Sequence, residues 1–213
     1  MRFIYFITWE KAKVFNCPPS ASLTVVGYFK MTVNYKEFTV DIVDDSTFSR
    51  GSTDNVFTYD KVYVEGTEQP TSKHGIRVFK DDRIVSSAIL CGTGGSAGIF
   101  DDSFIVTGNT LLICCGDNVF SLKLPALTLD WKKKFDLITC FAIYPYKDDF
   151  IVHGELEVKK IDLNGNIKWS FSARDIFVTQ EGNKAVKFLG DKIELTDWEN
   201  NKYIINEHGQ LTE

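Results

Sequence analysis

The chain has 213 residues, of which 44% are hydrophobic and 25% are charged, and this composition is typical of a globular protein rather than a disordered or fibrous one. Its 24 basic and 29 acidic residues give a net charge of −5, which argues against non-specific binding to nucleic acid or to an acidic membrane surface. No apolar run reaches the roughly 20 residues of a membrane span, and the length suits a single large domain.

The first residues contain a short apolar run, 3–7, that ends at Thr8 and is followed by Glu10 and Lys11. A secretory signal needs a longer apolar stretch and a cleavage site of small residues, so we interpret this run as a strand. Without an export signal we expect a cytoplasmic protein.

Short runs of aromatic and β-branched residues recur between turn residues, which is typical of strands. Pairs of aspartates mark several of the turns, because an Asp side chain bonds nearby backbone N–H groups. No segment of a dozen residues shows the 3.6-residue periodicity of a helix, so we expect an all-β chain with little helix. The clearest strand runs are 23–29, 38–43, 61–64, 76–79, 84–90 and 111–115.

The five cysteines show irregular spacing and no Cys-x-x-Cys pair, so a zinc or redox motif is not indicated. Cys114 and Cys115 are adjacent and could close a vicinal disulfide. In a strand, however, neighbouring side chains point to opposite faces, so we expect reduced thiols that pack as small apolar groups. The cysteines are Cys17, Cys91, Cys114, Cys115 and Cys140.

An internal repeat is visible in the second half of the chain. Residues 112–117 align with residues 150–155 at an offset of 38, and each block ends in Gly followed by an acid. Trp131 aligns with Trp169 at the same offset. A repeated Trp of this kind is expected to lie buried between neighbouring repeats.

Two further copies extend the pattern. One begins at 186–191 and carries Tyr203 where the others carry Trp, and a weaker one covers 62–80. A period of 34–40 residues with about four short strands per unit is the signature of a β-propeller blade. The sequence therefore predicts a single domain, a small β-propeller of about four to five blades, closed or open. The units are 61–98, 99–136, 137–175 and 176–213, and residues 1–60 form an irregular first blade or closing strands.

Residues 160–171, KIDLNGNIKWSF, resemble the blade ending of the PQQ-like (quinoprotein-type) propeller repeats. That ending has an apolar residue, Asp, a short turn with Gly, an apolar residue, any residue and Trp. The resemblance implies a propeller fold. Quinoproteins of this type have about eight blades, an export signal and a calcium site beside the quinone. This chain has room for about five blades and shows no export signal, so we expect no cofactor.

The glycine-rich segment 91–98 formally fits the dinucleotide fingerprint G-x-G-x-x-A, but the residues that follow indicate strands rather than the helix that such a site requires. A loop with so little side-chain bulk can approach a ligand closely, although a plain connection between blades is the alternative. A second connection, 68–75, also breaks the repeat. We predict a partner or ligand surface on these two loops. The candidate residues are Gly92, Gly94, Gly95, Ser96, Pro70 and His74.

A second group of candidates belongs to the repeat itself. Asp117, His153 and Glu155 stand at or beside the end of an apolar strand, where they could face a central channel. No metal-ligand spacing and no G-x-S-x-G nucleophile motif is present. The basic run 132–134 has no aromatic residues interleaved to stack on bases, so we interpret it as a solvated sheet edge.

Three function classes remain open from the sequence. The favoured one is a non-catalytic binding or scaffold protein that presents propeller loops to a protein partner, one form of which is a bacterial immunity or accessory protein. An enzyme, a hydrolase or lyase with a site in the central channel, is the first alternative. A carbohydrate-binding module that stacks sugars on Trp131, Trp169 or Trp198 is the second, with Trp198 outside the repeat pattern.

Overall fold

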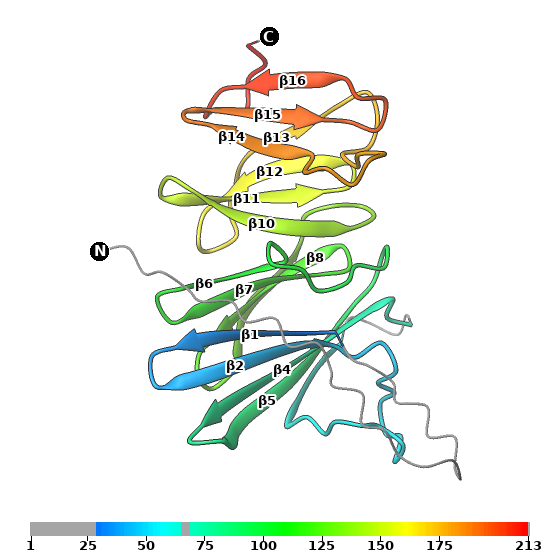
Figure 1. The fold of residues 1–213 in the computed structure, drawn as a ribbon, viewed down its shortest axis with the longest axis vertical. Helices are drawn as coiled ribbons and strands as arrows, with labels where there is room; N and C mark the ends of the chain where they lie inside the picture. The colour runs from blue at the N-terminus through cyan, green and yellow to red at the C-terminus, as the bar shows by residue number, and fades with distance from the viewer. Residues whose placement is uncertain (1–28, 65–68, 213) are drawn as a thin grey trace, which may run out of the picture.

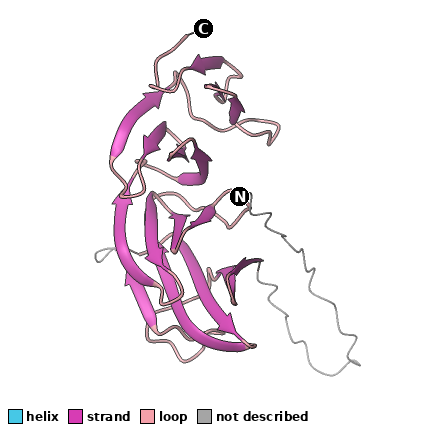
Figure 2. Cartoon of the chain, turned by 90° about the vertical axis from the view of Figure 1, so that its left-hand side faces the viewer, coloured by secondary structure: helices cyan, strands magenta, loops and turns pink. Residues whose placement is uncertain are grey.

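The computed structural model describes residues 29–64 and 69–212, which form sixteen β-strands in four sheets and no helix. The prediction of an all-β chain is therefore confirmed. The sheets follow one another along the long axis of the molecule (Figure 1), and the view from the side shows them along an arc (Figure 2). The described residues form no closed barrel or ring, and none of them belongs to a helix that could cross a membrane. The expected strand at 3–7 and residues 23–28 of the expected strand 23–29 lie outside the described residues, as does Cys17.

The first sheet has five strands in the order β1-β2-β4-β5-β3. Neighbours are antiparallel except for β3, which pairs with β5 in parallel. The predicted unit 61–98 does not form a sheet of its own, because its strands join β1 and β2 from the region expected to be irregular. The strands are β1 (Lys30–Tyr35), β2 (Phe38–Asp44), β3 (Lys61–Val64), β4 (Ser72–Lys80) and β5 (Arg83–Gly92).

The second and third sheets are four-stranded antiparallel meanders, each built from consecutive strands. The offset of 38 residues found in the sequence aligns the second strand of the second sheet with the second strand of the third sheet. The second sheet contains β6 (Phe104–Thr107), β7 (Thr110–Cys115), β8 (Asn118–Lys123) and β9 (Thr128–Lys134). The third contains β10 (Cys140–Tyr146), β11 (Asp149–Gly154), β12 (Glu157–Ile161) and β13 (Ile167–Ser172).

The fourth sheet has three strands, β14 (Val186–Leu189), β15 (Lys192–Thr196) and β16 (Lys202–Ile205). This sheet corrects the alignment of the third repeat copy. Residues 186–191 are a first strand and its turn, whereas residues 112–117 are a second strand and its turn. Tyr203 lies on a third strand, so it is not the counterpart of Trp131 and Trp169, which lie on fourth strands. The error arose because the turns at 116–117, 154–155 and 190–191 all read as an apolar run followed by Gly and an acid, although they follow strands in different positions of a sheet.

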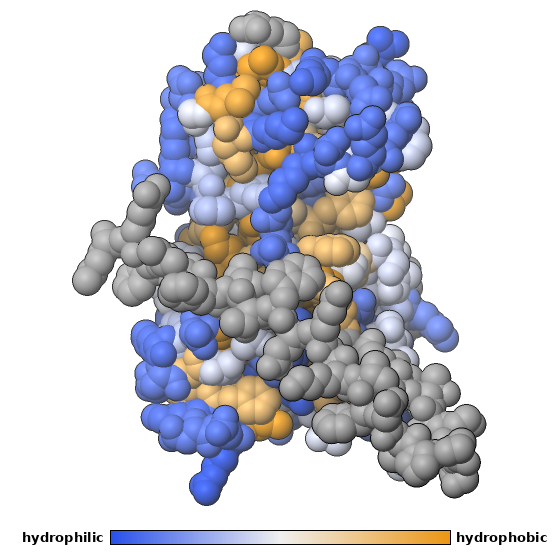
Figure 3. Space-filling model, in the orientation of Figure 1, coloured by the Kyte–Doolittle hydropathy of each residue, from blue (hydrophilic) through white to orange (hydrophobic). Residues whose placement is uncertain are grey.

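The sheets pack face to face through apolar side chains. In the first interface Ile42 and Ile76 pack in one cluster with Leu111 of the second sheet. Phe135 and Val152 belong to the second interface, and Ile151 belongs to the third. Hydrophilic side chains cover much of the upper sheets on the face seen in Figure 3, with apolar patches between them. All six residues of β7 are buried, because neighbouring sheets cover both of its faces.

Each meander has two edges. At one, called the hairpin edge here, the first strand turns into the second and the third into the fourth. At the other, called the linker edge, the second strand turns into the third and the chain passes to the next sheet. The three linkers between sheets are residues 93–103, 135–139 and 173–185.

The two repeat tryptophans join neighbouring sheets at the hairpin edge. The Trp131 indole N–H donates to the carbonyl of Leu163, 3.1 Å away, and the Trp169 indole N–H donates to the carbonyl of Glu207, 2.8 Å away. Each ring lies over the glycine of a turn in the next sheet: Trp131 lies over Gly165, and Trp169 lies over Gly209. We call this arrangement the aromatic clamp. Both side chains are partly buried and pack against the apolar clusters of the second and third interfaces.

The first junction has a clamp that the sequence analysis missed. The Tyr63 hydroxyl on β3 donates to the carbonyl of Leu127, 2.9 Å away, in the turn between β8 and β9. Lys61 binds the neighbouring carbonyl of Ala126 at 2.8 Å. All three junctions between the described sheets therefore carry an aromatic residue that bonds a turn of the next sheet.

Candidate functional site

The glycine segment is the linker from the first sheet to the second, and it lies tightly against the rest of the linker edge. A Cβ atom on Gly92 would lie 2.2 Å from the carbonyl oxygen of Cys115, and one on Gly95 would lie 1.9 Å from Thr139 Oγ1. The Gly95 N–H donates to the carbonyl of Ile138 at 2.6 Å. Gly94 has a positive φ of 85°, which favours glycine. Close packing therefore accounts for glycine at these positions.

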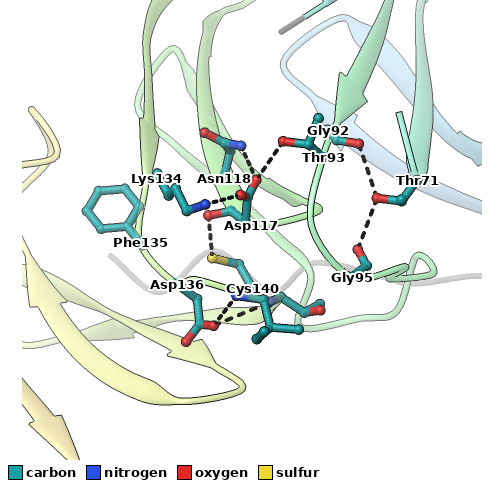
Figure 4. A network of polar contacts seen from close by, with 12 residues as sticks. Thr71, Gly92, Thr93, Gly95, Asp117, Asn118, Lys134, Phe135, Asp136 and Cys140 are labelled. Atoms are coloured by element: carbon teal, nitrogen blue, oxygen red, sulfur yellow. Dashed lines mark hydrogen bonds and ion pairs between the residues drawn. The ribbon is translucent and has the colours of Figure 1, made fainter. Parts of the chain in front are cut away.

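Asp117 meets this segment, so the structure brings together one predicted channel residue and one predicted loop (Figure 4). Asp117 is almost fully buried, and its N–H donates to the carbonyl of Thr93 at 2.9 Å. Its carboxylate accepts from Thr93 Oγ1 at 3.3 Å and from the Asn118 amide, and it pairs with Lys134 Nζ at 2.7 Å. Lys134 belongs to the basic run interpreted as a solvated edge, yet its ammonium neutralises this buried charge.

Asp136 is a structural residue of the linker edge that sequence reasoning missed. Its buried carboxylate accepts backbone hydrogen bonds from Ile138 and Thr139, at 2.8 and 3.3 Å. It also accepts from Leu156 and Glu157 in the next sheet, at 2.9 and 3.0 Å. One carboxylate thus holds a linker against the turn between β11 and β12. No motif marks this Asp in the sequence, because its partners are main-chain groups.

His153 lies beside this turn and is buried. Its Nε2 lies 2.8 Å from the carbonyl of Phe177, and its ring contacts Phe141 edge-on. Burial lowers the pKa of His153, so the imidazole is neutral at pH 7. Glu155 is half-buried, and its backbone accepts from Phe177 N at 2.7 Å. These two candidates lie at the linker edge, where they tie the third linker to the third sheet.

His74 and Pro70 lie apart from each other. His74 is fully buried in β4, with Nδ1 3.0 Å from the carbonyl of Cys114 and Nε2 3.0 Å from that of Ala97. Burial lowers the pKa of His74 as well. Pro70 lines a separate cavity of about 280 Å³ beside Cys91. The expectation that 68–75 forms a loop is wrong from Ser72 onward, because that residue begins β4 and its neighbours pair with both β2 and β5.

The same backbone bond fastens each linker to the next sheet. Besides the bond from Asp117 to Thr93, the N–H of Glu155 donates to the carbonyl of Thr139 at 2.8 Å, and the N–H of Trp198 donates to that of Ile176 at 2.9 Å. Because the linkers are held in this way, side chains that project from them are presented on a fixed backbone.

Residues of the second and third linkers line an open hollow of about 440 Å³, which we call the linker groove. Four of its eight lining residues are apolar and four are charged or polar. Leu137 and Ile176 come from the two linkers, and Leu156 comes from the turn between β11 and β12. Leu137 is 68% exposed, a large fraction for a leucine. Charged and polar side chains complete the lining. They are Glu157, Ser172, Arg174 and Asp175.

The cysteines do not add a reactive or metal-binding site within the described residues. Cys91, Cys114, Cys115 and Cys140 are free and buried. Desolvation raises the pKa of each thiol, to about 11 for Cys91, so the thiols are protonated at pH 7. No group of three or more described His, Cys, Asp or Glu residues is placed to hold a metal ion.

Comparison with known proteins gives little further information. No protein-family model and no curated protein matches the chain. One similar solved structure is the AfRom2 CNH domain, with a TM-score of 0.45 and 10% sequence identity. The match covers 86% of this chain and 66% of that one, so the chain spans slightly less than two thirds of the CNH domain chain.

Proposed function

We propose that the four sheets are the blades of an open β-propeller and that the protein is a non-catalytic binding protein that presents its linker edge to a protein partner. The blade interpretation is supported by the four-stranded meanders, their spacing of 38 residues and their face-to-face packing. The binding surface is the linker groove, and the exposure of Leu137 beside this partly apolar hollow is the observation that carries the proposal.

The groove has the composition of an interface centre. Protein interfaces place apolar anchors in a central hollow and surround them with polar groups that stay in contact with water. Here Leu137, Leu156 and Ile176 supply large apolar side chains to the lining, while Arg174 and Glu157 supply charged ones. A large apolar side chain left this exposed loses water contact only when another molecule covers it.

Three titratable groups at this edge are occupied by structural bonds. Asp117 is paired with Lys134, Asp136 holds four backbone N–H groups, and His153 is bonded to a carbonyl. A general acid or base has to reach a substrate atom, whereas these three groups are bonded to other groups of the protein. This supports binding over catalysis for the linker edge.

The test is quantitative capture of partners from the native host with variants of the groove. Leu137→Asp places a charge at its exposed centre. We expect a partner that binds the wild-type protein in a 1:1 ratio, and we expect affinity for the purified partner to fall at least tenfold in the variant, as for an interface anchor. Unchanged affinity for every such partner would refute the groove as the binding surface.

Leu189→Asp is the matched control, because Leu189 is 49% exposed but lies on β14, away from the groove. Both variants should melt within a few degrees of the wild type, since each changes an exposed side chain. Loss of binding in both variants would indicate a general effect of added charge and would count against the groove.

Carbohydrate binding is the second candidate, and one observation favours it. Trp198 is 43% exposed beside the third linker, whereas the Trp131 and Trp169 indoles are engaged in aromatic clamps. An exposed indole can stack on a sugar ring. If Trp198→Ala abolishes binding on a glycan array and leaves the melting temperature unchanged, this second function is supported. If no glycan binds the wild-type protein, it is rejected.

A further inference from the structure

A cavity of about 460 Å³ lies on the outer face of the first sheet, away from the linker groove. Met31 and Ile42 point from this sheet into the interface with the second sheet. Because side chains alternate along a strand, Thr32 and Asp41 point to the opposite face. The cavity is lined there by Lys30, Thr32, Asp41, Phe79, Asp81 and Asp82.

The position of this cavity corresponds to that of an aromatic clamp. In the third sheet, Trp131 of the preceding sheet covers the turn between the third and fourth strands at the hairpin edge. In the fourth sheet, Trp169 covers the turn that follows β16. The equivalent turn of the first sheet joins β4 to β5 at Asp81 and Asp82, which line the cavity. Within the described residues no sheet precedes the first one to supply a clamp.

The sequence before residue 29 contains a segment that is similar to the one around Trp131. Residues 7–11 read Ile-Thr-Trp-Glu-Lys, and residues 129–133 read Leu-Asp-Trp-Lys-Lys. Both have an aliphatic residue two places before Trp and a Lys two places after it. In the second sheet this Lys also takes part in the clamp, because Lys133 Nζ binds the carbonyls of Asn164 and Gly165, 2.9 and 3.0 Å away.

Charge and chain length fit the same placement. Four carboxylates line the cavity. Asp41 pairs with Lys30 at 3.4 Å and with Arg77 at 3.5 Å, and Glu37 pairs with Lys80 at 3.8 Å, so Asp81 and Asp82 at the turn are the carboxylates considered for a further cation. The segment that follows Trp9 carries two lysines, at positions 11 and 13. β1 begins at Lys30, which lines the cavity, and Phe29 before it lies beside Asp44 and Phe100. Trp9 precedes β1 by 21 residues, a separation similar to the 17 residues between Trp169 and β14.

We propose that residues 7–11 of the same chain dock on the outer face of the first sheet, with Trp9 in the cavity beside the turn at Asp81 and Asp82 and Lys11 against the carboxylates. The docked segment acts as the clamp for the first sheet. This interaction lies at the hairpin edge and is independent of the partner surface proposed above.

The test is photo-crosslinking in the full-length protein. A benzophenone-bearing phenylalanine analogue takes the place of Trp9, the sample is irradiated, and the linked peptides are identified by mass spectrometry. We expect intramolecular links to peptides that contain residues 30–41 or 79–83. Links mainly to any other surface, or no links, would overturn the proposal.

A mixture of isotopically light and heavy chains separates the same chain from a second copy. Links within one chain keep a single isotope label and support the proposal. Links that join light and heavy chains would show that the segment of another copy fills the cavity, and this result would overturn docking within one chain.

Charge reversal tests the contribution of the lysine. Lys11→Glu, combined with the crosslinker at position 9, should reduce the yield of these links about twofold to fivefold, the range for an exposed ion pair. Adding Asp81→Lys should restore most of the yield. Lys187→Glu on the fourth sheet is the control and should leave the yield unchanged. An unchanged yield in Lys11→Glu would contradict the placement of Lys11.

Discussion

Trp169 joins the third sheet to the fourth, and its replacement by Ala measures what an aromatic clamp contributes to stability. The indole is half-buried, packs on the backbone of Gly209 and donates to the carbonyl of Glu207. A fully buried aromatic side chain covers roughly 150–250 Å², so half of that area contributes about 2 to 3 kcal/mol at 25 cal/mol per Å². The hydrogen bond adds about 1 kcal/mol. We therefore expect Trp169→Ala to lower the free energy of unfolding by about 3 to 4 kcal/mol.

The assay is chemical denaturation followed by far-ultraviolet circular dichroism, with a thermal melt beside it. For a chain of this size the expected loss corresponds to a fall of roughly 6 to 16 °C in melting temperature. Trp169→Phe keeps most of the ring and removes the N–H, so it should cost about 1 to 2 kcal/mol. Trp198→Ala removes an exposed indole and should cost less than either. A denaturation midpoint for Trp169→Ala equal to that of the wild type would refute the clamp.

Three further predictions concern the linker edge and the buried side chains. Gly95→Ala should lower the free energy of unfolding, measured by denaturant titration, by about 1 to 3 kcal/mol. Adding Thr139→Ala to this variant should restore a good part of the loss, because it removes the Oγ1 atom that the new methyl group meets. If the double variant regains no stability, the close approach of Gly95 to Thr139 is contradicted. Asp136→Asn should lower the free energy of unfolding by about 2 kcal/mol, because it weakens charge-assisted hydrogen bonds to the backbone. The control Asp130→Asn changes an exposed residue and should lower it by under 1 kcal/mol. Equal losses would refute the structural role of Asp136. The free energy of unfolding should fall by up to about 1.4 kcal/mol per pH unit for each buried histidine as the pH drops below 6.5, the ordinary pKa of histidine, because a histidine whose pKa is lowered in the folded protein takes up its proton mainly in the unfolded chain. In His74→Gln the free energy of unfolding should therefore change less steeply with pH. The same steepness as in the wild type would contradict the burial argument.

Five of the sixteen strands match the clearest strand runs of the sequence. The runs 38–43, 61–64, 76–79, 84–90 and 111–115 all lie within strands of the structure, and β4 and β5 are longer than predicted. Alternating apolar side chains and turn-forming aspartates are local signals, and they act within a few residues of where they stand. The equivalence of Trp131 and Trp169 was also visible, because each repeat meets the same neighbour in the same way.

The assignment of strands to positions within a sheet could not be read from the sequence. Residues 186–191 and residues 112–117 look alike, yet one is a first strand and the other a second strand. Both hairpins need the same apolar run and the same tight turn, so local sequence does not distinguish them. The addition of β3 to the first sheet in parallel was hidden for a similar reason, since pairing partners are selected by packing between distant segments.

The candidate surface depended most on tertiary structure. The sequence marked the glycines and Asp117 by their place at strand ends, but only the folded chain shows that Gly95 packs on Thr139 and that Asp117 is neutralised by Lys134. The linker groove had no sequence signal at all, because Leu137 and Ile176 read as ordinary apolar residues in connections. Their exposure depends on where the neighbouring linkers lie. Backbone hydrogen bonds between segments about 20 residues apart set those positions. Every non-proline residue has the N–H and C=O groups that make such bonds, so they leave no signal in the sequence.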